Sequence, residues 1–336
     1  MKKDFCIGAL YAVGAALIGI VALLWCGLGM PGRSYDGALP QATREENDLA
    51  ARLRRHVAAV ASEPHNIRHY ANLEKAARYL ERTLTAEGYR VVSQPYDATE
   101  WTVWNLEVSI EPLENTPATR TIVIGAHYDS FSDAPGANDN GSGVAALLEL
   151  ARLLNDLPPR RTRLRLAFFV NEEPPYFQTD DMGSWRYAQQ LVERKEPVAA
   201  MISLETLGYF SDAPGTQQYP QPFGAVFGDK ANFVAFVGMP DSRPLVQEVM
   251  ASFRQHTDFP SIGGVAPAFI PGMNWSDHGS FAEYGFQAMM ITDTAVFRYP
   301  HYHKPSDTPD KLDYARLARI TKGVERVLRE MLEKRG

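Results

Sequence analysis

The sequence predicts an α/β fold, a three-layer sandwich in which helices cover both faces of a mostly parallel sheet. Short apolar runs that are typical of buried strands alternate along the chain with longer segments of helical periodicity. Repetition of strand, helix and strand is typical of a parallel central sheet. In addition, the apolar runs at 121–126, 164–170 and 201–204 are each followed shortly by histidine or acidic residues, as expected where strands end at one edge of a sheet.

The N-terminal stretch predicts a membrane anchor at residues 1–32. No charged residue occurs between Phe5 and Gly32, a stretch longer than the roughly 20 residues that span a bilayer as a helix. A cleaved signal peptide has an apolar core of only about 7 to 15 residues and a cleavage site flanked by small residues, which this stretch does not offer. Lys2 and Lys3 favour an N-terminus inside the cell. We therefore expect a single-pass anchor in the cell membrane, with the lipid bilayer as a partner and the rest of the chain outside the cytoplasm.

Three alternatives concern this anchor. Cys26 could mark a lipoprotein, but Trp25 is a poor residue before a lipid-bearing cysteine. Cleavage near Gly32 would instead release the chain from the membrane. A buried helix of the soluble fold is disfavoured by the length of the uncharged stretch.

Residues 33–42 are predicted to be a linker, because the chain here is rich in Gly, Pro and Ser, and residues 43–336 to be one domain. A chain of 336 residues with 45% hydrophobic residues can bury one large core. Cys6 and Cys26 are the only cysteines and lie in the predicted anchor, so the domain is expected to have no disulfide. The net charge of −6 argues against nucleic acid as a partner.

Periodicity predicts the main elements of the domain. Apolar residues with helical spacing predict two helices after the linker and one near the C-terminus. Apolar and polar residues alternate from Trp104 to Ile110, which predicts a half-exposed, antiparallel strand. The helical positions are Leu49, Leu53, Val57 and Val60; Leu73, Ala77, Leu80 and Leu84; and Leu317, Ile320, Val324, Leu328 and Met331.

Side chains of the kind that bind metals follow the apolar runs. Taken singly, such residues more often belong to surface turns or solvated acidic loops. However, side chains at the carboxyl ends of parallel strands converge on one crevice. Asp139 lies in the sequence DNGSG, on a tight loop before a helix for which Ser142 is the expected N-cap. We predict one site made of His127, Asp139, the pair Glu172 and Glu173, Glu205 and, from an aromatic stretch near the end of the chain, His303.

These residues lie in an ordered set of motifs: GAHYDS at 125–130, GANDNGSGVAALLELAR at 136–152, FFVNEE at 168–173, ISLE at 202–205, SDHGSF at 276–281 and YHKPSDTPDKL at 302–312. The set resembles the co-catalytic zinc exopeptidases of metallopeptidase family twenty-eight, which includes bacterial aminopeptidases, glutamate carboxypeptidase and glutaminyl cyclases. The resemblance extends from Leu49 to the C-terminus.

The resemblance implies the zinc exopeptidase fold and two Zn²⁺ ions per chain. It implies that His127 and Glu205 hold one ion and that Glu173 and His303 hold the other. Asp139 would bridge the ions. Glu172 would be the general base. The chain departs from the family in having Glu205 where Asp is frequent and Asn140 where a second Asp is frequent; neither departure removes a ligand.

The chemistry of these residue types agrees with the implied roles. Zinc binds His nitrogen and carboxylate oxygen, and a catalytic site keeps one position open for water. Two cations roughly 3.5 to 4 Å apart can share a water and lower its pKa to about 7. Glu172 would take the proton and pass it to the leaving amine. Tyr302 is the predicted donor to the developing oxyanion, and Asp129 is the predicted carboxylate that orients the His127 imidazole. Asp277 and His278 are expected to support the site or to cap a helix.

The predicted function is a membrane-anchored, zinc-dependent exopeptidase that acts on peptides and releases N-terminal residues. Glu172 and Glu205 offer acceptors for a free amine, whereas no arginine lies in the metal motifs to bind a C-terminal carboxylate. The segments Pro174–Met182 and Tyr209–Phe227 are expected to form the pocket rim. An apolar first residue of the substrate is favoured by aromatic residues in segments that could wall the pocket, namely Tyr176, Phe177, Trp185, Tyr209, Phe210 and Trp275.

Other functions of the same fold stay open. A glutaminyl cyclase of this family works with one zinc ion and lacks the first histidine, so His127 counts against it. A carboxypeptidase-type relative would bind the other end of the peptide. A non-catalytic module that kept the fold and lost its metals is disfavoured because all five ligand positions and the base are filled.

Overall fold

A computed structural model describes residues 28–113, 117–157, 159–220 and 223–333. One sheet runs through this part of the chain in the order β1-β2-β4-β3-β5-β8-β6-β7. The central strands β4, β3, β5 and β8 are parallel to one another, as are β6 and β7, whereas β1-β2, β2-β4 and β6-β8 are antiparallel pairs. The prediction of a mostly parallel central sheet is confirmed. The strands are β1 (Val92–Ala98), β2 (Trp101–Ile110), β3 (Arg120–His127), β4 (Thr162–Phe169), β5 (Val198–Glu205), β6 (Val234–Gly238), β7 (Ser261–Val265) and β8 (Ala288–Thr292).

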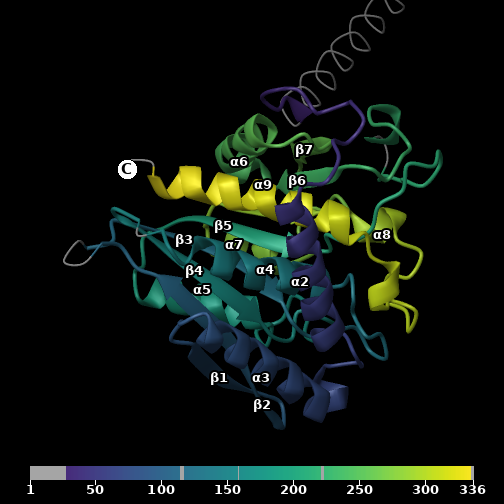
Figure 1. Ribbon diagram of the computed structural model, residues 1–336. Helices are drawn as coiled ribbons and strands as arrows, with labels where there is room; N and C mark the ends of the chain where they lie inside the picture. The colour runs from purple at the N-terminus through teal and green to yellow at the C-terminus, as the bar shows by residue number, and fades with distance from the viewer. Residues whose placement is uncertain (1–27, 114–116, 158, 221–222, 334–336) are drawn as a thin grey trace, which may run out of the picture.

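Helices cover both faces of the sheet, so the predicted three-layer sandwich is also confirmed (Figure 1). The larger core lies between one face and the helices α2, α3, α4, α6 and α9. A smaller core lies between the other face and the helices α5 and α7. The helices are α2 (Arg44–Val60), α3 (Tyr70–Ala86), α4 (Gly141–Leu154), α5 (Gly183–Glu193), α6 (Arg243–His256), α7 (Asp277–Glu283), α8 (Ala295–Arg298) and α9 (Tyr314–Glu333).

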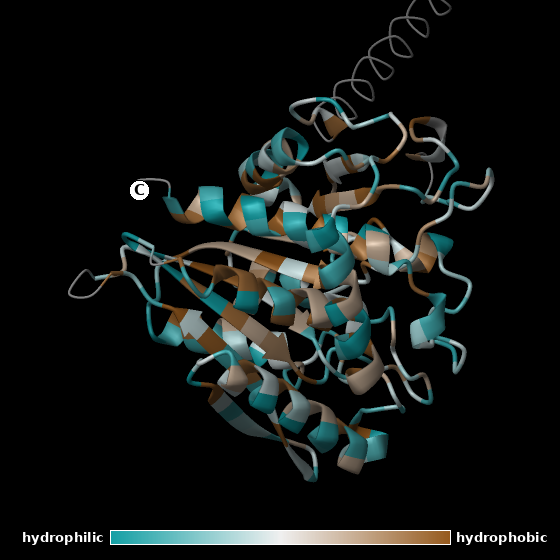
Figure 2. Ribbon diagram, viewed as in Figure 1, coloured by the Kyte–Doolittle hydropathy of each residue, from teal (hydrophilic) through white to brown (hydrophobic). Residues whose placement is uncertain are grey.

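The predicted helices form for the expected reasons. α2 begins at a capping box, in which Thr43 Oγ1 accepts the backbone N–H of Glu46 at 3.1 Å and Glu46 Oε2 accepts that of Thr43 at 2.8 Å. The apolar positions predicted for α2, α3 and α9 are all buried. Figure 2 shows the same division, with hydrophobic residues along the central strands and hydrophilic residues spread over the outer helices. Burial of one apolar face therefore fixes how each helix packs.

The predicted half-exposed strand is β2, and the prediction of its exposure is wrong. The strand is antiparallel to both neighbours, as expected. However, the polar residues Asn105 and Glu107, which alternate with the apolar ones, are also buried. α5 covers them: Asn105 Nδ2 donates to the carbonyl oxygen of Gly183 at 2.9 Å, and the Tyr187 hydroxyl donates to Glu107. Hydrogen bonds to this helix allow polar side chains to face the smaller core.

The segment 28–42 lies along α6 and β7, at the top of Figure 1. Arg254 in α6 donates through Nη1 to the carbonyl oxygen of Pro31 at 2.8 Å. The backbone N–H of Ser261 at the start of β7 donates to Ser34 Oγ at 2.9 Å. The predicted linker is thus held against the domain by hydrogen bonds, and its predicted bounds stay a prediction.

The predicted membrane anchor falls mainly on residues 1–27, which lie outside the described part of the chain. Within the described residues, no helix combines the length and the hydropathy that crossing a membrane requires. The anchor and the orientation of the chain stay predictions.

Candidate metal centre

The side chains predicted to form one site meet at the carboxyl ends of the central strands. Neighbouring parallel strands bring their ends to the same edge of the sheet, so residues far apart in sequence become neighbours there. The loop before α4 and the loop after α8 reach the same edge. The six residues are His127 (end of β3), Asp139 (before α4), Glu172 and Glu173 (after β4), Glu205 (end of β5) and His303 (after α8).

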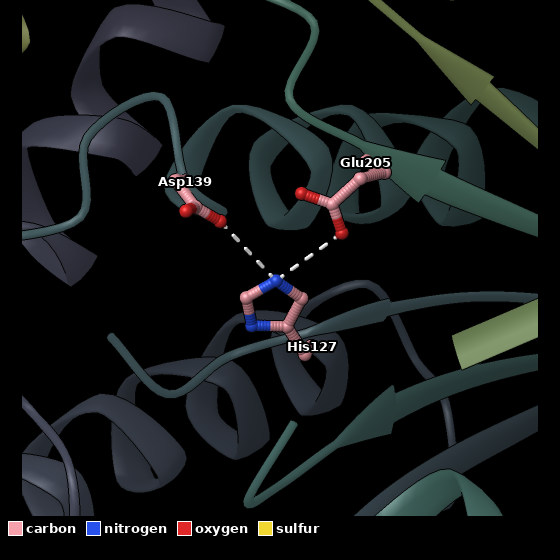
Figure 3. Close-up of side chains that lie close together, drawn as sticks. All are labelled: His127, Asp139 and Glu205. Carbon is pink, nitrogen blue, oxygen red and sulfur yellow. Dashed lines mark ion pairs between the residues drawn. The ribbon is translucent and has the colours of Figure 1, made fainter. Parts of the chain in front are cut away.

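One group of potential ligand atoms surrounds Nε2 of His127. Asp139 Oδ1 lies 3.4 Å from this nitrogen, and Glu205 Oε2 lies 3.3 Å from it. Figure 3 shows the three side chains converging from three different elements. Their ligand atoms lie within 4.8 Å of one another. Imidazole nitrogen and carboxylate oxygen at this spacing form a set that one small cation could contact.

A second group lies beside the first and shares Asp139 with it. The Nε2 atom of His303 lies 3.1 Å from Asp139 Oδ2 and 3.4 Å from Glu173 Oε2. The His303 ring is stacked against the rings of Phe131 and Tyr302, each with a centroid distance of 3.9 Å. Asp139 therefore presents one carboxylate oxygen to each group, as a bridging ligand would.

The histidine of the first group is oriented by the backbone. Its Nδ1 atom lies 3.1 Å from the carbonyl oxygen of Asp129, so His127 can donate there and turn Nε2 toward the carboxylates. Three buried atoms of the two groups lack a hydrogen-bond partner: His127 Nε2, Asp139 Oδ2 and Glu173 Oε1. Because buried polar atoms are nearly always paired, unpartnered atoms of these types fit a cation site.

The Asp129 carboxylate accepts hydrogen bonds from the backbone of the acidic pair Glu172 and Glu173. The sequence did not predict this role. Its Oδ1 atom accepts the backbone N–H of Glu172 at 3.0 Å, and its Oδ2 atom accepts that of Glu173 at 3.1 Å. The carboxylate lies 3.7 Å from Nδ1 of His127, farther than the Asp129 carbonyl oxygen. The expected orientation of the imidazole is thus provided mainly by the backbone, while the side chain connects β3 to the turn after β4.

Burial and like charge dominate the electrostatics of the site. Burial raises the pKa of Glu173 to about 8, and the Asp139 carboxylate adds to this rise. Burial also raises the pKa of Glu172 and of Glu205. Burial alone would lower the pKa of His303, but Asp139 and Glu173 raise it to about 10. Without a metal, bound protons offset the negative charge of the buried carboxylates. Divalent cations would offset the same charge in place of these protons.

Comparison with known proteins decides the family. The family model described as Peptidase family M28 matches residues 105–328. The chain belongs to peptidase family M28. The family predicted from the motifs is therefore confirmed.

Two curated relatives are similar in sequence to this M28 chain over different shares of their length. YfbL of Escherichia coli K12, described as uncharacterized, is 39% identical over 262 residues, which are 75% of this chain and 79% of that protein. The human BOS complex subunit NCLN is 45% identical over 151 residues, which are 40% of this chain and 26% of that protein.

Two solved structures share the fold. The LapA aminopeptidase of Legionella pneumophila has a TM-score of 0.67 at 19% identity. The match covers 89% of this chain and 78% of the LapA chain. The glutaminyl cyclase of Fimbriiglobus ruber has a TM-score of 0.63 at 17% identity. The match covers 90% of this chain and 99% of the cyclase chain. Because aminopeptidase and cyclase have the same fold, the activity of this M28 chain has to be argued from its site.

Glu172 stands at the M28 site without belonging to either group of potential ligand atoms. Its Oε2 atom lies 3.8 Å from His127 Nε2. Tyr302 lines the pocket beside the site together with Glu205. Burial raises the pKa of the Tyr302 hydroxyl well above its ordinary value, with Asp139 adding to the rise. The hydroxyl therefore keeps its proton and is able to donate a hydrogen bond.

Backbone conformations that are uncommon for side-chain-bearing residues cluster at the site. Asn171, directly before the acidic pair, has a φ of 60°, and Thr206, directly after Glu205, has a φ of 45°. His303 itself has a φ of 56°. Such left-handed conformations cost free energy and concentrate where a chain has to aim functional side chains.

Two supporting residues were not assigned from the sequence. Asp307 Oδ2 accepts the backbone N–H of Asp139 at 3.1 Å, and its Oδ1 atom accepts that of Asn138 at 2.9 Å. Ser276 Oγ donates to Glu205 Oε2 at 2.7 Å. Both residues lie inside the motifs that carry the M28 resemblance, YHKPSDTPDKL and SDHGSF, and these motifs are the signal that could have found them.

The N-cap of α4 is Asn140, whereas Ser142 was expected. Asn140 Oδ1 accepts the backbone N–H of Gly143 at 3.1 Å and that of Thr206 at 3.0 Å. Its Nδ2 atom donates to the carbonyl oxygen of Leu204 at 2.8 Å. An ionised aspartate, which is frequent here in the family, could not donate this last bond. The amide thus ties α4 to the end of β5, where Glu205 lies.

Asp277 and His278 are buried at the start of α7 and belong to neither group. Burial raises the pKa of Asp277 to about 7. His278 Nε2 lies 2.8 Å from the carbonyl oxygen of Met273, so this imidazole supports the loop before α7.

An open pocket adjoins the site, and its lining is almost entirely uncharged. Glu205 is the only charged residue among its described lining residues. The predicted rim segment Tyr209–Phe227 contributes to it through Gln217, Tyr219, Pro220, Phe223 and Phe227.

The aromatic wall predicted for this pocket is largely wrong. Of the six aromatic residues named from the sequence, Trp275 lines the pocket. Phe210 packs edge-on against Phe259 in the core instead, and Trp185 lines a separate pocket with Gln178. The expectation failed because residues near a strand end in sequence can face either the crevice or the helices beside it.

Proposed function

We propose that this chain is a zinc-dependent aminopeptidase with two Zn²⁺ ions per chain. The observation that carries the proposal is the pair of histidine and carboxylate groups that share Asp139. The unpartnered ligand atoms and the excess of buried carboxylates support it. The proposed ligands are His127 and Glu205 for one ion, Glu173 and His303 for the other, and Asp139 as the bridge.

The surrounding residues provide the proton transfers that peptide hydrolysis needs. When bound, the cations would polarise the scissile carbonyl and lower the pKa of a water to about 7. Glu172 is not a proposed metal ligand, and its backbone N–H donates to the Asp129 carboxylate. Its own carboxylate takes the proton from the attacking water and passes it to the leaving amine. Tyr302, which keeps its proton, donates to the oxygen that gains negative charge.

The pocket favours the N-terminal end of a peptide with an apolar first residue. No cationic side chain occurs among its described lining residues, so a C-terminal carboxylate has no ionic partner there. Glu172 and Glu205 offer acceptors for a protonated α-amine. Trp275, Phe227 and Ile270 are among the apolar residues that would surround the first side chain.

The membrane location is also part of the proposal and rests on the sequence. The predicted anchor at residues 1–32 would hold the chain in the cell membrane by a single pass, with the part before Leu28 in the bilayer because Gly29 and Pro31 are hydrogen-bonded to α6. The catalytic domain, residues 43–336, would lie outside the cytoplasm after the linker at 33–42. The support is the uncharged stretch from Phe5 to Gly32 and the lysines before it.

A panel of four substrates tests the proposed activity. A leucyl anilide with a free amine should be cleaved, and its N-acetylated twin should resist cleavage, because the amine has lost its charge. Cleavage of a dipeptide with a C-terminal acidic residue in preference to the anilide would indicate a carboxypeptidase. Cyclisation of an N-terminal glutamine would indicate a glutaminyl cyclase. Failure of the zinc-loaded chain on all four would leave the aminopeptidase proposal without support, and His127→Ala is the matched inactive control.

A further inference from the structure

Large apolar side chains are exposed around the mouth of the pocket. Phe269 is 82% exposed and Trp275 is 43% exposed, and Val226 and Val296 are exposed as well. Trp275 and Val296 line the pocket, while Phe269 and Val226 belong to the loops that carry other lining residues. We call these four residues the apolar rim. Large apolar side chains that are exposed at one pocket are candidates for a binding surface.

The chain that follows the predicted anchor is fastened beside this rim. Leu28, the first described residue, itself lines the pocket. The carbonyl oxygen of Gly29 accepts hydrogen bonds from Arg243 Nη2 at 3.2 Å and from Gln247 Nε2 at 3.1 Å, both in α6. Arg254 holds the next residues through the carbonyl oxygen of Pro31. The point at which the chain enters the domain is therefore fixed next to the pocket mouth.

The charge pattern of the sequence favours lipid as the partner of this rim. The uncharged stretch from Phe5 ends at Gly32, and Arg33, the first charged residue after it, is exposed. With the proposed anchor in a bilayer, Leu28 would lie at the membrane surface, and the rim at the same pocket would lie near the headgroups and the upper acyl chains. Tryptophan is enriched at this level, and exposed apolar side chains beside it gain free energy by inserting there.

We propose that the apolar rim inserts into the surface of the lipid bilayer, so that the pocket opens toward the membrane. This inference rests on the proposed membrane anchor and extends the proposed function. The expected substrates are peptides whose apolar N-terminal residues lie at the membrane surface. The pocket would receive such a residue directly from the interface, without passage through water.

A depth measurement on the full chain tests the inference. Cys6 and Cys26, the only cysteines, are replaced by serine, and Phe269→Cys introduces one site for an environment-sensitive nitrobenzoxadiazole label. Val192→Cys on α5 is the matched control, because Val192 is also apolar and is 45% exposed. α5 lies far from the segment 28–42 in Figure 1. Both variants alter exposed side chains, so the fold should be retained.

The labelled chains are reconstituted in phosphatidylcholine and phosphatidylglycerol vesicles that carry a nitroxide on the upper acyl chain. The label at position 269 should lose at least about half of its emission, whereas the label at position 192 should lose little. Equal emission from both labels in chains that float with the vesicles would overturn the inference and leave the rim to a protein partner. Failure to float would overturn it together with the anchor. Cleavage of the soluble leucyl anilide by the same samples tests the aminopeptidase proposal separately.

Discussion

The carboxylate of Asp307 accepts the backbone N–H of Asp139, at 3.1 Å, across 168 residues of sequence. Asp139 is the residue that both groups of potential ligand atoms share. The loop that carries Asp307 also carries His303, so one short C-terminal segment provides a potential ligand and fixes the backbone of the bridging residue. Both groups should therefore respond to changes at Asp307.

Asp307→Asn should lower zinc affinity roughly 10- to 100-fold. The substituted amide has one oxygen, so either Asp139 or Asn138 loses the acceptor of its backbone N–H. Zinc affinity is measured by competition with a chromophoric chelator. Asp310→Asn is the matched control, because Asp310 is an exposed neighbour that pairs with Lys311 and Thr308. Equal affinities in the two variants would show that Asp307 does not position the site.

Glu172→Gln should abolish turnover and leave both zinc ions bound. The loss should reach roughly 10² to 10⁴ in kcat, because the proton transfer is removed while the ligands stay. Glu173→Gln, the matched change at the adjacent residue, should weaken zinc binding. Metal content and kcat are measured on both variants, which are nearly isosteric with the original side chains. Loss of zinc to the same extent in both would mean that the two roles have been misassigned.

Zinc affinity should rise with pH between about pH 6 and pH 8, because the ligands have to lose protons before they bind a cation. Burial raises the pKa of Glu173 to about 8, and the pKa of His303 is about 10 because Asp139 and Glu173 outweigh its burial. Below these values the site holds protons, so zinc binding must release them. Calorimetry in buffers of different ionisation enthalpy measures this release. Binding heats that do not depend on the buffer would contradict the prediction.

A reporter that works only outside the cytoplasm, fused after Gly336, should be active. Removal of residues 1–27 should release the chain from the membrane and keep the hydrogen bonds of Gly29 and Pro31 to α6. The two results are measured by reporter activity in cells and by fractionation. A silent reporter in cells that contain the full-length chain would reverse the proposed orientation. A mature chain that begins near Gly32 would show cleavage in place of anchoring.

Periodicity and strand ends allowed the sequence to predict a mostly parallel sheet, the helices α2, α3, α4 and α9, and the meeting of the six site residues. These features depend on local patterns and on one rule of parallel sheets. The buried polar residues of β2 were mispredicted because alternation alone does not tell which helix covers the second face. Asn105 and Glu107 form hydrogen bonds with Gly183 and Tyr187, which follow 78 and 80 residues later.

The supports of the site were the least predictable part. Asp129 and Asp307 act by accepting backbone N–H groups of residues that are distant in sequence, and hydrophobic periodicity does not reveal such bonds. Asn140 replaced Ser142 as the cap because its amide also reaches β5, a contact that exists only in the folded chain. The lining of the pocket was missed for a similar reason, since its loops come from segments without periodicity.

The zinc content of the purified chain tests the central claim most directly. After gentle purification, zinc supplementation and removal of free metal, the chain should contain two zinc ions, because two groups of ligand atoms share Asp139. His127→Ala should contain less zinc and should not hydrolyse the leucyl anilide. One ion or none in the intact, folded chain would contradict the co-catalytic centre.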